Sequence, residues 1–318
     1  MKKLILNIFL IFFISASAQQ IPKIVRSEII HYENNLIVTN RNYYDNNLDS
    51  DLNFTKIVVD STLDRPWGIS CEDLDGDGDV DIVISQNHGV NSLTHKIDWY
   101  ENIVNFEFIP HNILVTDKYE IDQVNIVDLD NDSDMDIVFV SFGSGGIGLN
   151  VLTNDGQMNF TKSMISPNIH WKFEVIDINQ DGLLDIVGNN NTYATTIYWV
   201  EQNSDHTFTS HLIDNDCGDA YGIDVVDLDS DNDLDIVQGA VNTYDDLYWY
   251  ENDGNEVFTK HFIDTDIQDP LDLICEDIDS DGDVDIVVPH TQFFFQVNCD
   301  GMKMMEISSL FTTLSQIR

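Results

Sequence analysis

The segment Asp73-Leu-Asp-Gly-Asp-Gly-Asp-Val-Asp81 has an acidic residue at every other position, and an Ile-Val pair follows it at once. The same pattern returns four more times, at intervals of 55, 49, 50 and 50 residues. The further copies begin at Asp128, Asp177, Asp227 and Asp277. A motif that recurs at a nearly fixed period indicates a repeat architecture, so we interpret the five segments as copies of one structural unit.

Each copy is nine residues long and follows one pattern of oxygen donors. Positions 1, 3, 5 and 9 are always Asp or Asn. Position 7 is Asp in four copies and Leu183 in the third, as expected if this position contributes only its backbone carbonyl. Position 6 mostly holds residues that tolerate the left-handed conformation that a tight loop requires. These residues are Gly78, Ser133, Gly182, Asn232 and Gly282.

Oxygen donors at alternate residues of a short loop favour Ca²⁺, because Mg²⁺ demands octahedral geometry and gives up its water reluctantly. Carboxylates held together without an ion would repel one another, so a bound cation should stabilise each loop. We therefore predict about five Ca²⁺ ions per chain, with the weakest site in the third loop, where Asn179 replaces a carboxylate. The predicted metal-site residues are Asp73, Asp75, Asp77, Asp79 and Asp81; Asp128, Asp130, Asp132, Asp134 and Asp136; Asp177, Asn179, Asp181, Leu183 and Asp185; Asp227, Asp229, Asp231, Asp233 and Asp235; and Asp277, Asp279, Asp281, Asp283 and Asp285.

The sequence around the loops predicts strands rather than helices. An EF-hand would place Glu at position 12 between two helices, but that position holds Ile84, Phe139, Gly188, Gln238 and Val288. Strand-forming residues flank each loop instead. Two more strands per period are indicated by segments such as Leu247–Asn252 and Phe258–Ile263, with an Asn-Asp-Gly hairpin signal between them. Four short antiparallel strands about every 50 residues is the period of a propeller blade.

The loops and their spacing resemble the VCBS/FG-GAP class of repeats, the integrin-alpha-like β-propellers, over roughly residues 53–298. The resemblance implies an all-β propeller of four-stranded antiparallel blades, with five recognisable blades. It also implies one Ca²⁺ per blade in the turn between the first two strands, held by Asp73, Asp75, Asp77 and Asp81 and the matching residues of the other loops. The Phe-Gly and Gly-Ala-Pro dipeptides that name one branch are absent as a set, which favours the VCBS-like branch.

The chain divides into four segments on this basis. Residues 1–18 are predicted to be a signal peptide, 19–52 an irregular segment or a degenerate blade, 53–298 the propeller, and 299–318 a divergent or truncated C-terminal segment. Residues 53–59 match the fourth strand of a blade but precede the first loop, so they could complete the last blade. Alternatively, Asp300–Ile307 gives the last blade a fourth strand of its own.

The amino terminus and the charge predict where the protein works. Lys2 and Lys3, an apolar run and Ser15-Ala16-Ser17-Ala18 fit a signal peptide cleaved before Gln19, so we expect a secreted, cell-surface or periplasmic protein. With 57 acidic against 14 basic residues the formal net charge is −43, which disfavours nucleic acid and anionic membranes as partners. No later segment is predicted to insert into a membrane. The hydrophobic content of 42% is nevertheless enough to fold a core.

The four cysteines do not form a dense disulfide pattern. Cys71 and Cys275 each lie two residues before an acidic loop, where other copies have Ile126, Val175 and Val225, so they should be buried apolar residues. Cys217 and Cys299 lie in turn-like sequence, where they could pair or stay free.

Aromatic residues near the expected channel mouth suggest a ligand-binding face. The candidates are Trp67, Trp171, Tyr221, Tyr193 and Tyr244, and the expected partner is an extracellular protein or polysaccharide. Packing within the inner ring is the alternative interpretation for these aromatic residues, whereas Trp99, Trp199 and Trp249 recur in register and should lie in the core.

We predict no catalytic residue, since His111, His211 and His261 recur as part of the repeat and no nucleophile or carboxylate pair stands apart from it. A binding or adhesion module is therefore favoured. The alternatives are a propeller-type polysaccharide lyase or another carbohydrate-active enzyme, and a purely structural part of a larger surface protein.

Overall fold

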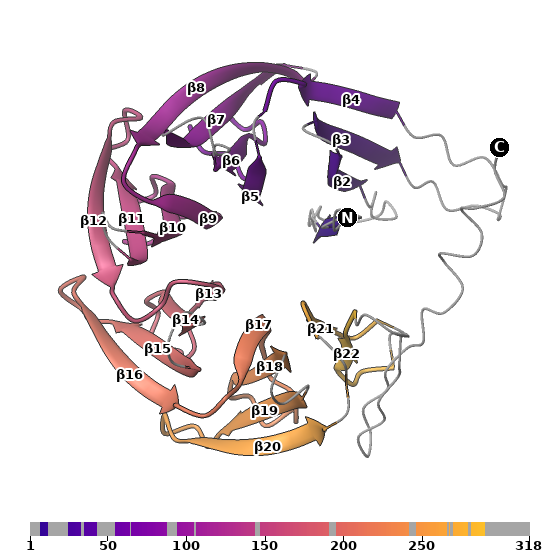
Figure 1. Cartoon of the computed structure of the whole chain (residues 1–318), viewed down its shortest axis with the longest axis vertical. Helices are drawn as coiled ribbons and strands as arrows, with labels where there is room; N and C mark the ends of the chain where they lie inside the picture. The colour runs from indigo at the N-terminus through magenta and orange to yellow at the C-terminus, as the bar shows by residue number, and fades with distance from the viewer. Residues whose placement is uncertain are drawn as a thin grey trace, which may run out of the picture.

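The computed structural model describes the central part of the chain and several strands before it. The described residues are 7–11, 25–32, 35–42, 55–63, 65–87, 94–104, 106–143, 147–190, 195–241, 246–265, 267, 270–278 and 281–289. All regular structure in these ranges is β-structure, arranged as separate antiparallel sheets around a central axis (Figure 1). Within them no helix is long and apolar enough to cross a membrane.

Five of the sheets have four strands each. They are formed by β1 (Asn7–Ile11), β2 (Val25–Tyr32), β3 (Asn35–Asn42) and β4 (Thr55–Asp60); by β5 (Pro66–Ser70), β6 (Ile82–Gln86), β7 (His95–Val104) and β8 (Glu107–Thr116); by β9 (Glu120–Val127), β10 (Asp136–Phe142), β11 (Gly148–Asn154) and β12 (Phe160–Ser166); by β13 (Phe173–Ile176), β14 (Asp185–Asn190), β15 (Thr196–Gln202) and β16 (Phe208–Asp214); and by β17 (Asp219–Val226), β18 (Asp235–Val241), β19 (Asp246–Asn252) and β20 (Phe258–Asp264). A sixth sheet contains β21 (Ile274–Glu276) and β22 (Asp285–Val287).

Each sheet that bears an acidic loop is an antiparallel meander, with its first strand nearest the axis and its last strand at the outside (Figure 1). This arrangement confirms the predicted all-β propeller with four-stranded blades. Four of the five loop-bearing repeats form complete four-stranded sheets, and the first two strands of the fifth are described. The predicted fourth-strand segment at Asp300–Ile307 lies outside the described residues.

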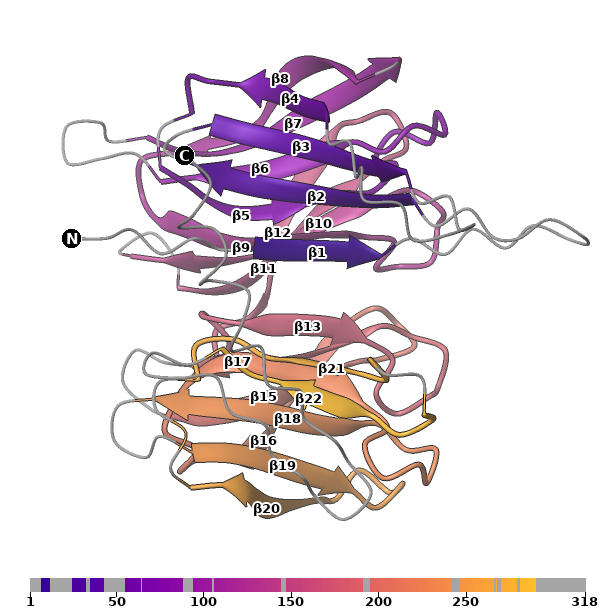
Figure 2. The same cartoon turned by 90° about the vertical axis from the view of Figure 1, so that its right-hand side faces the viewer.

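The N-terminal sheet has no acidic loop and stands between the first and last repeats in the ring (Figure 1). Figure 2 shows it on the same side of the molecule as β21 and β22. β4 pairs with β3, from Leu36↔Asp60 to Asn40↔Thr55. Residues 55–60 are thus the fourth strand of this sheet, and the interpretation that they complete the last blade is wrong. β1 lies inside the predicted signal peptide, which stays a prediction.

The core lies between neighbouring blades. One buried cluster joins Val83 and Trp99 of the first loop-bearing blade to Ile121 and Phe139 of the second, and equivalent clusters join the later blades. The second, third and fourth loop-bearing blades each pack apolar faces against two neighbours. This packing holds their first strands and the loops that follow them in a defined place.

The core also tests two predictions about buried residues. Trp99 and Trp199 are buried and Trp249 is partly buried against the next blade, which confirms them as core residues. Cys71 and Cys275 are buried and free, as expected, and Cys217 is a third buried free thiol. Cys299 lies outside the described residues.

Candidate metal centres

The five acidic loops connect the first strand of a blade to the second, at β5–β6, β9–β10, β13–β14, β17–β18 and β21–β22. All of them bend in the same way at position 6, where the amide N–H donates to Oδ2 of the Asp at position 1. In the first loop this bond joins Gly78 N to Asp73 Oδ2 at 2.9 Å. The side chain of the position 1 Asp thus closes each loop by a hydrogen bond within the protein, without the help of an ion.

The backbone of position 6 adopts positive φ in every copy, as the sequence predicts. The φ angles are 97° at Gly78, 78° at Ser133, 92° at Gly182, 77° at Asn232 and 99° at Gly282. Position 4 also has positive φ in the four loops where it is described, which sequence reasoning missed. The residues are Gly76, Asn131, Gln180 and Ser230.

Positions 5 and 7 show which atoms the loop leaves available. The position 7 amide donates to Oδ1 of position 5 in all five loops, as in Asp79 N to Asp77 Oδ1 at 2.9 Å. A Cβ built on Gly156 or Gly254, in the hairpins that follow the third strand, would lie 2.4 or 2.3 Å from Oδ2 of Asp134 or Asp233. The position 7 side chain therefore packs on the hairpin in these loops, which agrees with a carbonyl ligand at this position.

Position 9 is the buried anchor of each loop. Asp81, Asp136, Asp185, Asp235 and Asp285 have side chains no more than 1% exposed. In four blades Oδ1 accepts the amide N–H from the end of the third strand at 2.8 Å. In four loops Oδ2 accepts the position 2 amide N–H. These carboxylates thus connect the loop to the third strand of its own blade.

Burial raises the pKa of these anchors against the opposing effect of the amide donors. The pKa of Asp81, Asp185 and Asp235 is raised to about 6, and that of Asp136 to about 7. Nearby loop carboxylates add to the rise. The protein alone therefore stabilises the negative charge of each position 9 carboxylate too little, and a bound cation would stabilise it further.

Three of the loops gather three carboxylates with one oxygen of each within 4.8 Å of the others. The groups are Asp73, Asp75 and Asp81; Asp128, Asp130 and Asp132; and Asp227, Asp229 and Asp231. All three groups contain the carboxylates of positions 1 and 3. The third carboxylate comes from position 9 in the first loop and from position 5 in the other two. The third loop has Asn179 in place of one carboxylate, and Asp279 of the fifth lies outside the described residues.

Unpartnered oxygens show that the donor set fits a hard cation. Within the described ranges, Asp73 Oδ1, Asp130 Oδ1 and Asp185 Oδ2 are buried without a hydrogen-bond donor. A buried carboxylate oxygen without a donor is costly unless it is paired or coordinates a metal. The residues present therefore suit an oxygen-coordinated ion such as Ca²⁺.

The recurrent histidines are structural parts of the repeat. His111, His211 and His261 lie at 2.7, 2.8 and 2.6 Å from Glu101, Glu201 and Glu251. Their rings contact Trp99, Trp199 and Trp249 at centroid distances of 4.5, 4.5 and 4.8 Å. Each histidine therefore closes the same Trp-Glu-His contact on the outer strands, which agrees with the interpretation made from the sequence.

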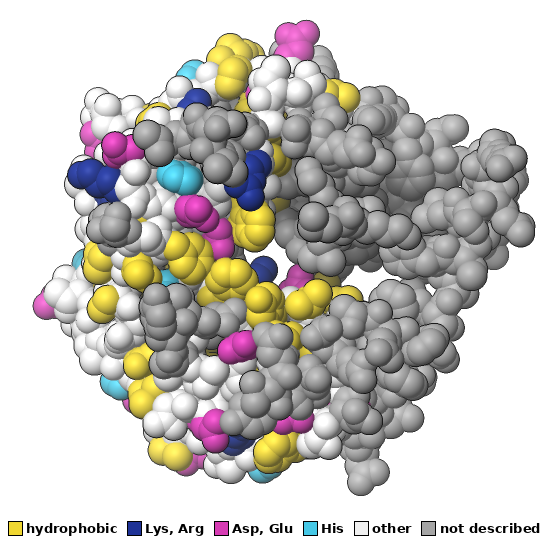
Figure 3. Space-filling view, in the orientation of Figure 1, with side chains coloured by type: hydrophobic (Ala, Val, Ile, Leu, Met, Phe, Trp, Pro, Cys, Tyr) yellow, Lys and Arg dark blue, Asp and Glu magenta, His cyan; other side chains and the backbone are white. Residues whose placement is uncertain are grey.

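The first strands surround a central cavity of about 520 Å³. Hydrophobic side chains gather around the central opening in Figure 3. Two of the predicted ligand-binding residues, Trp67 and Trp171, line the cavity, and Trp67 is 51% exposed rather than packed. Tyr221 contacts Trp171 edge-to-face at 5.3 Å. Tyr193 and Tyr244 lie outside the described residues.

The cavity also contains acidic groups, including one that sequence reasoning missed. Glu174 lines it beside Asp122 and Lys172. Burial, together with the nearby Asp224, raises the pKa of Glu174 to about 8, and burial raises that of Asp122 to about 7. Ser70 and Asp224, at the same strand position as Glu174, accept amide N–H groups of the next blade. No such bond to Glu174 is found in the described structure, so its carboxyl group is available to the cavity.

Comparison with known families agrees with the repeat seen in the fold. A family model described as FG-GAP-like repeat matches residues 73–139, 128–188 and 177–238. The matches together cover residues 73–238, just over half of the chain, and each begins at the first Asp of an acidic loop. A search of curated proteins found no match. On the combined basis of the loops, the blades and these matches, the chain belongs to the FG-GAP-like repeat family.

Proposed function

We propose that the protein is an exported, calcium-stabilised β-propeller that binds an extracellular protein or polysaccharide. The observation that carries the calcium part is the shared loop geometry, in which buried carboxylate oxygens such as Asp73 Oδ1 and Asp130 Oδ1 lack a donor within the described structure. Calcium would supply the missing positive charge at each loop. The loops lie between packed strands, so calcium binding should stabilise the whole ring.

Thermal unfolding in calcium and in EDTA tests this proposal. Calcium binds the folded loops and has little affinity for the unfolded chain, so the melting temperature should rise with calcium concentration. Magnesium at the same concentration is the matched control, and it should stabilise less. An unchanged melting temperature in EDTA would show that the loops do not depend on an ion.

The ligand-binding part of the proposal is supported by the central cavity. Trp67, which is half exposed, and Trp171 both line this cavity, so both offer aromatic surface to a ligand. A glycan array and a pull-down with extracellular proteins should identify the partner. Trp67→Ala should weaken binding, whereas Val257→Ala, at an exposed residue of the β19–β20 turn, should not.

Export rests on the sequence of residues 1–18. We propose cleavage before Gln19, which would place the protein outside the cytoplasm. Intact-mass measurement of the protein from the culture medium, the cell surface and the periplasm tests both the compartment and the new N-terminus. Retention of Met1 in a cytoplasmic protein would contradict the proposal.

A carbohydrate-active enzyme is the second candidate, and the same cavity favours it. The pKa of Glu174 is raised to about 8 and that of Asp122 to about 7, so both groups titrate near neutral pH, as proton donors and acceptors in active sites do. Release of reducing or unsaturated ends from polysaccharides, lost in Glu174→Gln, would support this function. Binding without any release would support the binding module.

A further inference from the structure

The boundaries between blades contain a repeated side-chain contact on their outer strands. Leu114, Ser166 and Asp214 occupy the same place in the sheet register, since each pairs with the first core residue of its third strand. Lys162, Ser210 and Lys260 likewise share a place on the fourth strand of the following blade. These two positions face one another where consecutive blades meet.

The contact is polar and matched at two boundaries. Ser166 Oγ lies 3.0 Å from Ser210 Oγ. Lys260 Nζ lies 2.8 Å from Asp214 Oδ2 and donates to the carbonyl of Asp216 at 2.7 Å. The lysine therefore has a carboxylate partner from the preceding blade. Its neighbour Tyr248 lies beneath it, with the ammonium 3.9 Å from the ring centroid.

The equivalent contact between the first two loop-bearing blades lacks its carboxylate. Lys162 faces Leu114 instead of an acidic residue, and both line a surface cavity of about 550 Å³. The Lys162 ammonium lies 4.8 Å from the ring centroid of Tyr119. In the described structure it forms no ion pair, in a chain with 57 acidic residues. Partial burial without a counter-ion lowers its pKa.

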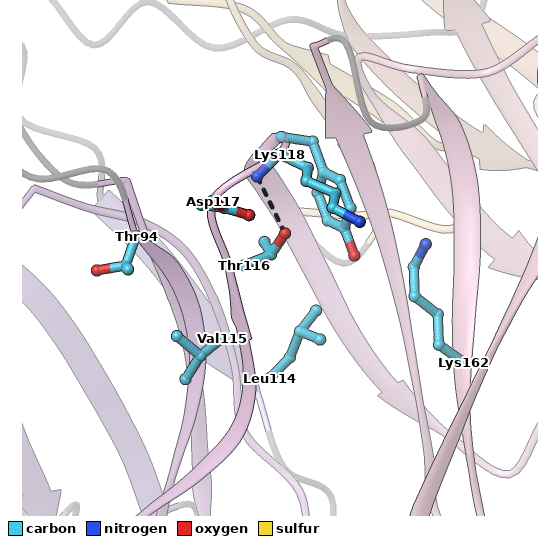
Figure 4. Close-up of a pocket in the computed structure, with 8 residues that line it drawn as sticks. Thr94, Leu114, Val115, Thr116, Asp117, Lys118 and Lys162 are labelled. Atoms are coloured by element: carbon cyan, nitrogen blue, oxygen red, sulfur yellow. Dashed lines mark hydrogen bonds between the residues drawn. The ribbon is translucent and has the colours of Figure 1, made fainter.

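A second lysine lines the same cavity. Figure 4 shows the side chains of Lys118 and Lys162 directed toward one another from opposite sides of the opening. Asp117 also lines the cavity, on the side opposite Lys162 (Figure 4), and no ion pair of Asp117 with either lysine is found in the described residues. Thr94 and Thr116 add hydroxyl groups, and Leu114 adds apolar surface. Charges elsewhere on the protein are screened beyond about 8 Å at physiological salt. The local charge therefore comes from Lys118, Lys162 and Asp117, and it is positive because two cations face one anion.

We infer that this cavity binds the carboxylate of an acidic saccharide, in the place that the Asp214 carboxylate occupies two blades later. The inference rests on the proposed function, since it names the class of polysaccharide that the propeller recognises. A uronate presents its carboxylate beside a ring with hydroxyl groups. Its carboxylate can therefore contact the lysines, and its hydroxyl groups can contact the threonines.

Calorimetric titration in saturating calcium tests the inference with two matched probes, trigalacturonic acid and its methyl ester. The acid should bind, and the ester, which has the same sugar backbone but carries an uncharged methyl ester in place of each carboxylate, should bind roughly ten- to hundredfold more weakly. Lys162→Met should weaken binding of the acid by a similar factor. Arg65→Met removes one charge next to β5, the strand nearest the axis and away from the cavity on the outer strands, and should leave binding unchanged.

Two substitutions of one residue separate charge from packing. L114D restores the acidic partner that Lys260 has and keeps both lysines, so it should abolish binding of the acid. L114N changes the packing equally without adding charge, so it should retain most of the binding. Melting temperatures of both variants in calcium show whether they are folded.

Equal binding of acid and ester, no binding of the acid, or equal binding by L114D and L114N would each overturn the inference. Other results decide whether the proposed function holds. Calcium-dependent melting and binding of a neutral glycan or a protein, unaffected by Lys162→Met, would leave it standing while the uronate site is rejected.

Discussion

Substitution of Asp235 by Asn tests the coupling between a loop and its blade most sharply. The Asp235 side chain is fully buried. Its Oδ1 accepts the Asn252 amide at 2.8 Å, and its Oδ2 accepts the Leu228 amide at 3.1 Å. Asn has the same shape but only one acceptor oxygen, so its NH₂ group would face one of these N–H donors.

The expected loss in the free energy of unfolding follows from the hydrogen bond that D235N removes. A hydrogen bond to a charged acceptor contributes about 1.5–3 kcal/mol, and a buried donor left without a partner costs about 1–3 kcal/mol. In calcium, D235N should therefore lower the free energy of unfolding by about 3–5 kcal/mol. In EDTA the loss should be smaller, because the raised pKa of Asp235 shows that its charge is under-compensated without an ion.

Chemical denaturation monitored by tryptophan fluorescence measures both free energies. Asp253→Asn is the matched control, since Asp253 lies in the exposed β19–β20 turn of the same blade. It should change the free energy of unfolding little in either condition. If D235N and D253N behaved alike in calcium, or if D235N lost as much in EDTA as in calcium, the anchoring role would be refuted.

Three further predictions follow from other parts of the fold. Glu174 has a raised pKa of about 8, so its folded state holds a proton that the unfolded chain releases near its usual pKa of about 4.5. Wild type should lose stability relative to E174Q as the pH rises from 5 to 8, and parallel stability curves would contradict this. Gly254→Ala should destabilise more than Gly76→Ala. Both glycines have positive φ, but only the first alanine would collide with Asp233; equal losses of melting temperature would refute the contact. Lys260→Met should destabilise the boundary that Asp214 closes more than Lys162→Met destabilises its own, as measured by melting in calcium.

The repeat, the fold class and the loop residues could be predicted because they recur in the sequence at one spacing. Five copies of the same nine-residue motif identify the residue type at each position, and the positive φ at position 6 follows from Gly, Asn and Ser there. The positive φ at position 4 was not predictable in this way. Gly76 and Asn131 tolerate this conformation, but Gln180 has no preference for it, and there the closed loop imposes it.

Features that depend on neighbouring blades were not predictable from single copies. Glu174 lies in an ordinary strand, and only the ring brings it into the cavity with Asp122. The pairing of β4 with β3 depends on an N-terminal sheet that has no acidic loop to reveal it. The unmatched Lys162 is visible only when the packing of neighbouring blades brings Leu114 into the same cavity.

The central claim is that each acidic loop is a calcium site on which the propeller depends. Calcium titration of the ion-free protein by calorimetry, with the bound ion counted afterwards by elemental analysis, tests it most directly. We predict about five ions per chain, one for each loop, with the third loop binding most weakly because it has fewest carboxylates. No bound calcium, or one ion per chain with a melting temperature that calcium does not change, would contradict the account.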